Sequence, residues 1–296
     1  MRSVFFDGQR HWRSGWKAVG FLLLTIVLTG PLLAGHRFLP AEARFFVPGS
    51  WVAFFGVLLS TAICVRLERR GGSSVGLRMD LRFARHLAGG IAAGVALVGV
   101  GTAIVWLAGG FHFVRVPEAQ VGLLLRSALV MLGVGLSEEL AFHGYAFQRL
   151  TQGIGPVKAQ LVMATIFALG HPVGDVPGSG RVWALVNVFV AALVFGLCFM
   201  RTGSLALPVG LHMGWNWAMG ALGVAVSGVE SKGWWAPVQH AGKEWLTGGS
   251  YGLEASPVDF GVLVAAALVL LRWKARPAAE HPGLPEAPLL AASTVR

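Results

Sequence analysis

The stretch "VGLLLRSALVMLGVGLSEELAFH", residues 121–143, places two adjacent carboxylates, Glu138 and Glu139, at the end of an apolar run. A helix needs about 20 mostly apolar residues to cross the hydrocarbon core. An ionisable side chain inside that core costs about 2.5–3.5 kcal/mol on insertion scales. The chain has only 14 acidic residues among 296. Two of them in this position predict a polar functional site inside a membrane protein.

The composition points to the same class of protein. The chain is 55% hydrophobic and 13% charged, whereas soluble domains carry about 25% charged residues. We expect an all-α, polytopic membrane protein with about eight transmembrane helices and a polar site inside the bundle. The first run is expected to be a retained helix rather than a cleaved signal peptide. The apolar runs lie at about 18–35, 48–65, 88–108, 119–148, 156–172, 182–200, 204–224 and 258–273.

The net charge of +10 is distributed in a way that suits a membrane and not a nucleic acid. Lys and Arg cluster in short segments between the apolar runs, most densely at 66–85. Such segments are typical of topology determinants and lipid-headgroup contacts. We therefore expect membrane lipids and no nucleic acid as partners. The positive-inside rule predicts that both termini are cytoplasmic, in a plasma membrane of the bacterial inner-membrane type.

The order of the runs suggests four parts of the chain. Residues 1–117 are expected to hold the first three transmembrane helices, and 118–225 a catalytic core of four. Residues 226–274 would form an outer loop and the eighth helix. The Pro- and Ala-rich segment 275–296 is expected to be a disordered cytoplasmic tail.

Three clusters of polar residues are predicted to meet at one membrane depth. At 1.5 Å per residue, Glu138 lies about 18 Å from the turn that follows its helix, and His171 lies about 22 Å beyond that turn. His212 and Asn216 lie about 13–20 Å above the next turn, and they share a helix face because they are four residues apart. The sequence therefore predicts one polar layer built by three segments.

The residue types in this layer suit hydrolysis. A carboxylate beside a histidine can take a proton from water, and a His and an Asn can donate hydrogen bonds to a developing oxyanion. Ser137 points away by one helical step, and Phe167 is expected to support the packing of the site. No HExxH or CxxC spacing is present, and Cys64 and Cys198 lie inside apolar runs, so no metal is expected.

The three clusters resemble the CAAX protease and bacteriocin-processing family of intramembrane glutamic endopeptidases, marked by EExxxR, FxxxH and HxxxN. Here the motifs read "EELAFH" (138–143), "FALGH" (167–171) and "HMGWN" (212–216). The resemblance implies that Glu138 and His171 activate water, that Glu139 assists or holds the geometry, and that His212 and Asn216 form the oxyanion site. It implies no cofactor, and a peptide or membrane-associated protein as substrate. The "GGSYGLE" loop, with Glu254, is also similar to a stretch in many bacterial members.

One position departs from the family pattern, because His143 stands where the first motif has arginine. A histidine matches the permanent charge of arginine only when protonated. This predicts either pH-sensitive activity or a relaxed requirement at this position. Arg149 is out of register and is no substitute. A catalytically weak membrane scaffold of the same fold stays an alternative, followed by a metalloprotease and a proton-coupled transporter.

Overall fold

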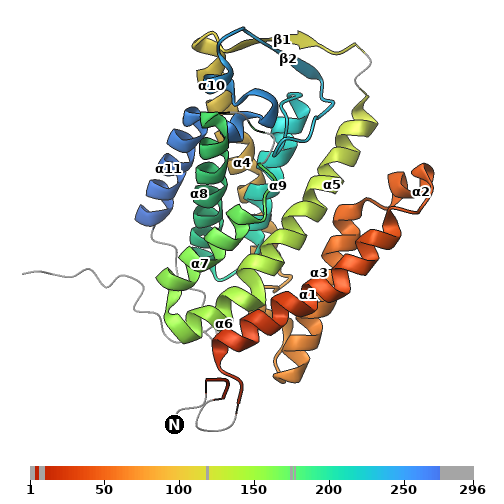
Figure 1. Ribbon diagram of the computed structural model, residues 1–296, viewed down its shortest axis with the longest axis vertical. Helices are drawn as coiled ribbons and strands as arrows, with labels where there is room; N and C mark the ends of the chain where they lie inside the picture. The colour runs from red at the N-terminus through yellow and green to blue at the C-terminus, as the bar shows by residue number, and fades with distance from the viewer. Residues whose placement is uncertain (1–3, 7–10, 118–119, 174–175, 177, 274–296) are drawn as a thin grey trace, which may run out of the picture.

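The computed structural model describes residues 4–6, 11–117, 120–173, 176 and 178–273, so the predicted tail at 275–296 lies outside the described residues. Most of the described chain is helical. The α-helices are α1 (Ser14–His36), α2 (Ala41–Phe46), α3 (Gly49–Leu67), α4 (Leu81–Leu107), α5 (Val121–Glu139), α6 (Tyr145–Ile154), α7 (Pro156–Leu169), α8 (Ser179–Thr202), α9 (Ala206–Ala221), α10 (Glu244–Thr247) and α11 (Pro257–Arg272). Figure 1 shows α4 and α9 inside the bundle, α8 and α11 on one side and α1 and α3 on the other.

The fold is that of an all-α, polytopic membrane protein, as the apolar runs predict. Among the described residues, five helical segments are long and apolar enough to cross a membrane: α1, α3, α4, the continuous segment Val121–Ile154, and α8. Large apolar side chains such as Leu23, Leu125 and Leu129 are exposed on the outer faces of these helices, which suits a hydrocarbon solvent. The number of eight crossings stays a prediction, and so does the division of the chain at 117 and 225.

The helix that carries the paired carboxylates is longer and less regular than the sequence suggests. The run predicted at 119–148 continues to Ile154, with a π-helical turn at Leu140–Gly144 between α5 and α6. Such turns inside α-helices are frequent at functional sites. The next helix follows at once, because Gly155 takes a positive φ of 82° and Pro156 starts α7. The connection is therefore shorter than the predicted turn "TQGIGP".

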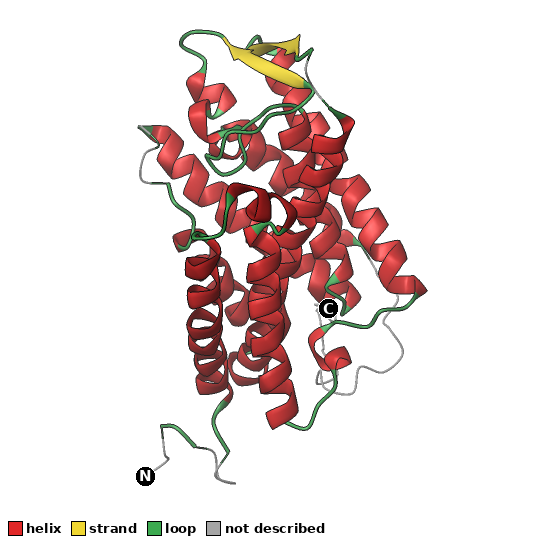
Figure 2. Cartoon of the chain, turned by 90° about the vertical axis from the view of Figure 1, so that its right-hand side faces the viewer, coloured by secondary structure: helices red, strands yellow, loops and turns green. Residues whose placement is uncertain are grey.

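The segment after α4 and the predicted outer loop contain structure that the sequence did not indicate. Strand β1 (Phe111–Arg115) pairs antiparallel with β2 (Trp235–Gln239). The sheet lies over one end of the bundle, away from the start of α1 (Figures 1 and 2). Strands of five residues, one of them containing Pro237, give little signal, because proline is depleted in strands. Short helical turns η3 (Gly249–Tyr251) and η4 (Leu253–Ala255) follow in the same segment.

Helices α4 and α9 pack backbone against backbone. A Cβ atom on Gly90 would meet the carbonyl oxygen of Leu207, and one on Gly94 would meet that of Leu211. On the other helix, Gly210 and Gly214 lie as close to the backbone of α4. Small residues at four-residue spacing allow this approach in membranes. The contact fixes the position of α9, which carries two of the predicted site residues.

A polar cluster at the other end of the bundle joins α1, α3 and α6. Glu68 Oε1 lies 3.0 Å from Lys17 Nζ and accepts a hydrogen bond from the Tyr145 hydroxyl, and Oε2 lies 3.3 Å from Arg149 Nη1. Burial alone would raise the pKa of the Glu68 carboxyl, but the Lys17 hydrogen bond and the Arg149 charge outweigh it and lower this pKa. Arg149 therefore serves this cluster, in line with the prediction that it does not replace the motif arginine.

Candidate active site

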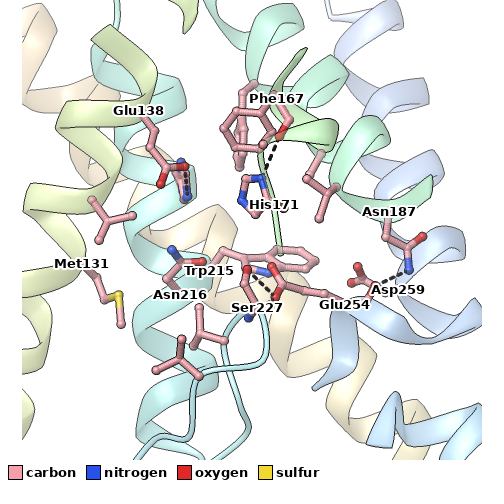
Figure 3. A pocket seen from close by; sticks show the side chains of 18 of the residues that line it. Met131, Glu138, Phe167, His171, Asn187, Trp215, Asn216, Ser227, Glu254 and Asp259 are labelled. Carbon is pink, nitrogen blue, oxygen red and sulfur yellow. Dashed lines mark hydrogen bonds and ion pairs between the residues drawn. The ribbon is translucent and has the colours of Figure 1, made fainter. Parts of the chain in front are cut away.

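A cavity of about 480 Å³ lies among α5, α8, α9 and α11 and the segments that connect them. Glu138 from α5, His171 after α7, and His212 and Asn216 from α9 all line it, with Phe167 beside them (Figure 3). Three segments far apart in the sequence therefore bring their polar side chains to one space, as the depth estimate predicts.

Glu139 does not line the cavity but lies behind it, with a fully buried side chain. Its two oxygens accept from two histidines: Oε2 lies 2.7 Å from His143 Nδ1, and Oε1 lies 2.9 Å from His212 Nδ1. A buried carboxylate is tolerated when such partners satisfy it. Glu139 therefore links the first motif to the third by direct contact.

His143 occupies the position of the motif arginine and reaches the same carboxylate. Its ring is 1% exposed, and its Nε2 atom has no hydrogen-bond partner among the described residues. A neutral imidazole with its proton on Nδ1 makes the bond to Glu139 and leaves Nε2 as a lone pair. A neutral histidine as well as a protonated one can therefore make this hydrogen bond to Glu139.

Glu138 is the carboxylate that faces the cavity. Its side chain is 33% exposed, and Oε2 lies 3.8 Å from His212 Nε2. None of the described residues makes a hydrogen bond to this oxygen. Glu138 and Glu139 are neighbours in sequence, yet one presents an acceptor to the cavity while the other is saturated inside the protein. The structure therefore places the two carboxylates in different surroundings, one at the cavity and one buried between two histidines.

His171 lies just beyond the end of α7, at Leu169, and not inside a helix reaching 172 as the sequence suggested. Gly170 ends the helix, and the His171 Nδ1 atom lies 2.8 Å from the carbonyl oxygen of Phe167. A carbonyl can only accept, so Nδ1 carries the proton and Nε2 of the neutral ring is an acceptor. The Phe167 ring lies 4.5 Å from the His171 ring and 6.4 Å from that of His212.

His212 and Asn216 lie one turn apart on α9, and both are 6% exposed. The Phe195 ring stacks on the His212 ring, with centroids 4.7 Å apart and planes tilted by 10°. The hydrogen bond to Glu139 holds the same ring from its Nδ1 edge. The stacking on Phe195 and the hydrogen bond to Glu139 therefore fix the orientation of the His212 ring. Its Nε2 atom points to the side where Glu138 lies.

The same region also bears on two other means of hydrolysis, a serine nucleophile and a bound metal ion. The Ser137 hydroxyl donates to the carbonyl oxygen of Val134 in its own helix, 2.9 Å away, and is engaged there. Within the described ranges, no three His, Cys, Asp or Glu side chains form a group that could hold a metal ion.

The opposite wall of the cavity carries polar residues that the sequence reading did not assign to the site. Asn187 of α8, Ser227, Glu254 and Asp259 of α11 line it (Figure 3). Burial raises the pKa of the Glu254 carboxyl, although the hydrogen bonds from the Ser227 backbone and hydroxyl act in the opposite direction. A polar residue such as Asn187 within the apolar run 182–200 was a signal that could have revealed this wall.

Comparisons with known proteins give a family match in the part of the chain that carries the three motifs. Residues 120–218 match the family model described as "Type II CAAX prenyl endopeptidase Rce1-like". The Bacillus subtilis (strain 168) protein named "Uncharacterized protein YyaK" is 31% identical over 93 residues. That match covers 30% of this chain and 30% of the length of that protein. The segment at 120–218, about a third of the chain, contains all three motifs and is therefore similar to the Rce1-like family of type II CAAX prenyl endopeptidases.

Proposed function

We propose that this protein is an intramembrane, metal-independent glutamic endopeptidase that hydrolyses a peptide bond close to the membrane. The Rce1-like family match supports a membrane-bound protease of the CAAX type. The observation that carries the finer proposal is that two hydrogen-bond acceptors, the partly exposed Glu138 carboxylate and His171 Nε2, belong to residues that line one cavity.

In this mechanism, a water molecule donates one hydrogen bond to Glu138 and the other to His171. Both protons are then engaged, and an oxygen lone pair is left to attack the scissile carbonyl carbon. Glu138 takes the proton as the C–O bond forms, and that proton later passes to the leaving amine nitrogen when the C–N bond breaks. General-base catalysis of this kind contributes about 10²- to 10⁴-fold.

His212 and Asn216 stabilise the oxyanion of the tetrahedral intermediate. Because His212 Nδ1 already donates to Glu139, the ring can donate from Nε2 only as an imidazolium. The carboxylates of Glu139 and Glu138, 2.9 Å and 3.8 Å from its two nitrogens, favour that charged form. Glu139 and His143 therefore act as positioning residues, which supports a relaxed requirement for arginine at position 143.

The cellular setting follows from the same proposal. The substrate is a peptide or a membrane-associated protein, held beside membrane lipids. The protein resides in the plasma membrane with both termini in the cytoplasm, as the distribution of Lys and Arg indicates. Prenylation of the substrate is one of the properties to be tested.

The test compares wild type, Glu138→Gln and Glu42→Gln in lipid nanodiscs. Glu42 is an exposed carboxylate on α2 and serves as the matched control. The probes are internally quenched peptides that end in a CAAX sequence, each with and without a farnesyl group. We expect Glu138→Gln to lower kcat/KM by about 10²- to 10⁴-fold and Glu42→Gln to leave it unchanged.

Peptidomics of cells that express each variant extends the test to natural substrates. A peptide cleaved equally well by wild type and Glu138→Gln would overturn the proposed role of Glu138. Unchanged peptides, together with an unchanged cellular phenotype, would favour a scaffold. Dialysis against a chelator should leave the rate unchanged, and a loss restored by added zinc would contradict the metal-independent mechanism.

A further inference from the structure

The cavity is acidic on two opposite walls, although the chain as a whole carries a net charge of +10. None of the described residues that line it is Lys or Arg. Glu138 belongs to the wall that also carries His212 and Asn216, and Asp259 and Glu254 lie across the cavity from Glu138 (Figure 3). Of the 14 acidic residues in the chain, four line this one cavity: Glu138, Glu230, Glu254 and Asp259.

Asp259 is the most unusual of these residues. It is 1% exposed, and neither carboxylate oxygen has a hydrogen-bond partner among the described residues. Figure 3 shows the carboxylate on the cavity side of α11. A buried carboxylate without a partner is strongly unfavourable as an anion, so Asp259 either binds a proton or pairs with a cationic group.

Helix capping does not account for Asp259. It is the third residue of α11, and Ser256 is the N-cap, so a capping box would pair the Asp259 carboxylate with the Ser256 backbone N–H. That N–H instead donates to the Leu253 carbonyl oxygen. Only the other half of the box is formed, from the Asp259 N–H to the Ser256 hydroxyl. The carboxylate is left for another use.

The surrounding atoms supply further acceptors. The Asn187 amide nitrogen is used twice, by the carbonyl oxygens of Glu254 and Ser256 at 2.8 Å each, and its own oxygen is buried without a partner. These two bonds hold the loop that carries Glu254 against the start of α11. A wall rich in acceptors and fixed in this way is complementary to a group with several N–H donors and a positive charge. Ammonium and guanidinium groups carry three and five such donors.

We propose that Asp259 and Glu254 form a subsite for the ammonium or guanidinium group of a Lys or Arg residue in the substrate. The peptidase then prefers peptides with a basic residue close to the scissile bond. This inference rests on the proposed function in so far as it takes the ligand to be a peptide. The subsite shares one cavity with Glu138 and His171, so a bound basic side chain also fixes the register of the peptide.

A binding measurement tests the subsite without requiring hydrolysis. Two dye-labelled peptides that differ only in Lys against Gln are titrated with Glu138→Gln protein in nanodiscs, with the fluorescence anisotropy of the dye as the readout. We expect the Lys peptide to bind tighter by about tenfold or more, as charge-assisted hydrogen bonds imply. Adding Asp259→Asn, or separately Glu254→Gln, should reduce this difference, whereas adding Glu42→Gln should not. Equal Kd values for the two peptides would overturn the inference.

Cleavage of the same pair by protein with Glu138 intact separates this inference from the proposed function. A Lys-to-Gln ratio of kcat/KM above about ten that falls towards one in Asp259→Asn supports both. Hydrolysis without any preference overturns the subsite while the peptidase stands. Preferential binding of the Lys peptide without hydrolysis overturns the peptidase and keeps the cation site. Two near-isosteric variants, each checked by size-exclusion chromatography, guard against a folding defect in one of them.

Discussion

Replacing His143 with alanine removes one of the two hydrogen bonds that Glu139 accepts. The Glu139 side chain is 0% exposed, so water cannot take the place of the lost donor at 2.7 Å. A hydrogen bond to a charged group contributes about 1.5–3 kcal/mol, and the carboxylate oxygen left behind stays buried and unsatisfied. At about 2–4 °C per kcal/mol, we expect Tm to fall by about 3–12 °C.

A double-mutant cycle turns this loss into a measurement of one contact. The variants are His143→Ala, Glu139→Gln and the double variant, each unfolded by heat in detergent and followed by the fluorescence of the chain's 11 tryptophans. In the Glu139→Gln background, His143→Ala should lower the free energy of unfolding by less than it does in wild type. We expect a coupling free energy of about 1–2 kcal/mol. Coupling of this size would assign His143 a positioning role equivalent to that of the motif arginine.

The control is His112→Ala. His112 bonds His240 at 3.0 Å on the exposed sheet, and a loss there should stay within about 0.5 kcal/mol. If the His143 and Glu139 substitutions are instead additive within about 0.5 kcal/mol, the contact does not hold the carboxylate. The proposal that His143 positions Glu139 in place of the motif arginine would then fail.

Three further outcomes follow from contacts outside the cavity. Gly94→Ala should separate α4 from α9 and lower both Tm and the proposed peptidase activity, whereas Gly99→Ala, whose Cβ meets nothing within 4 Å, should leave both unchanged in the same two assays. Glu68→Gln should destabilise the protein by about 1–3 kcal/mol, because Arg149 loses a charged partner, and a Tm equal to that of wild type would contradict this. Since the folded-state pKa of Glu68 is lowered, its contribution is present above about pH 4.5 and is lost as the pH falls below that value. The Tm of wild type should therefore fall more steeply than that of Glu68→Gln in a titration from pH 6 to about pH 3.

The helices could be predicted because a membrane imposes a strong pattern on them. Runs of apolar residues mark α1, α3, α4 and α8 to within a few residues, apart from an earlier start for α4 at Leu81. The π-helical turn at Leu140–Gly144 could not be predicted, because it changes hydrogen bonding without changing composition. The strands β1 and β2 were missed for another reason: their pairing joins segments more than a hundred residues apart.

The site could be predicted as a set of residues but not as a set of contacts. Depth counting along helices suffices to bring Glu138, His171 and His212 together, because rise per residue is constant. Glu138 and Glu139 both lie in the regular helix α5, before the π turn, and which of them faces the cavity depends on how α5 is turned against its neighbours. Asp259 was missed since an acidic residue three positions after a serine, at the start of an apolar helix, reads as a capping box. Only the backbone bond from Ser256 to Leu253 shows otherwise.

The glycine contacts between α4 and α9 limit how modular this protein can be. The segment that matches the family model begins at residue 120, after α4, and among the described residues that line the cavity none belongs to α4. Without α4, Gly210 and Gly214 would face lipid, and the helix bearing His212 would lose the surface that sets its height. Transplanting the motif-bearing helices into another scaffold therefore requires α4 to be carried along, as an accessory that contributes no reactive group but determines where the reactive groups stand.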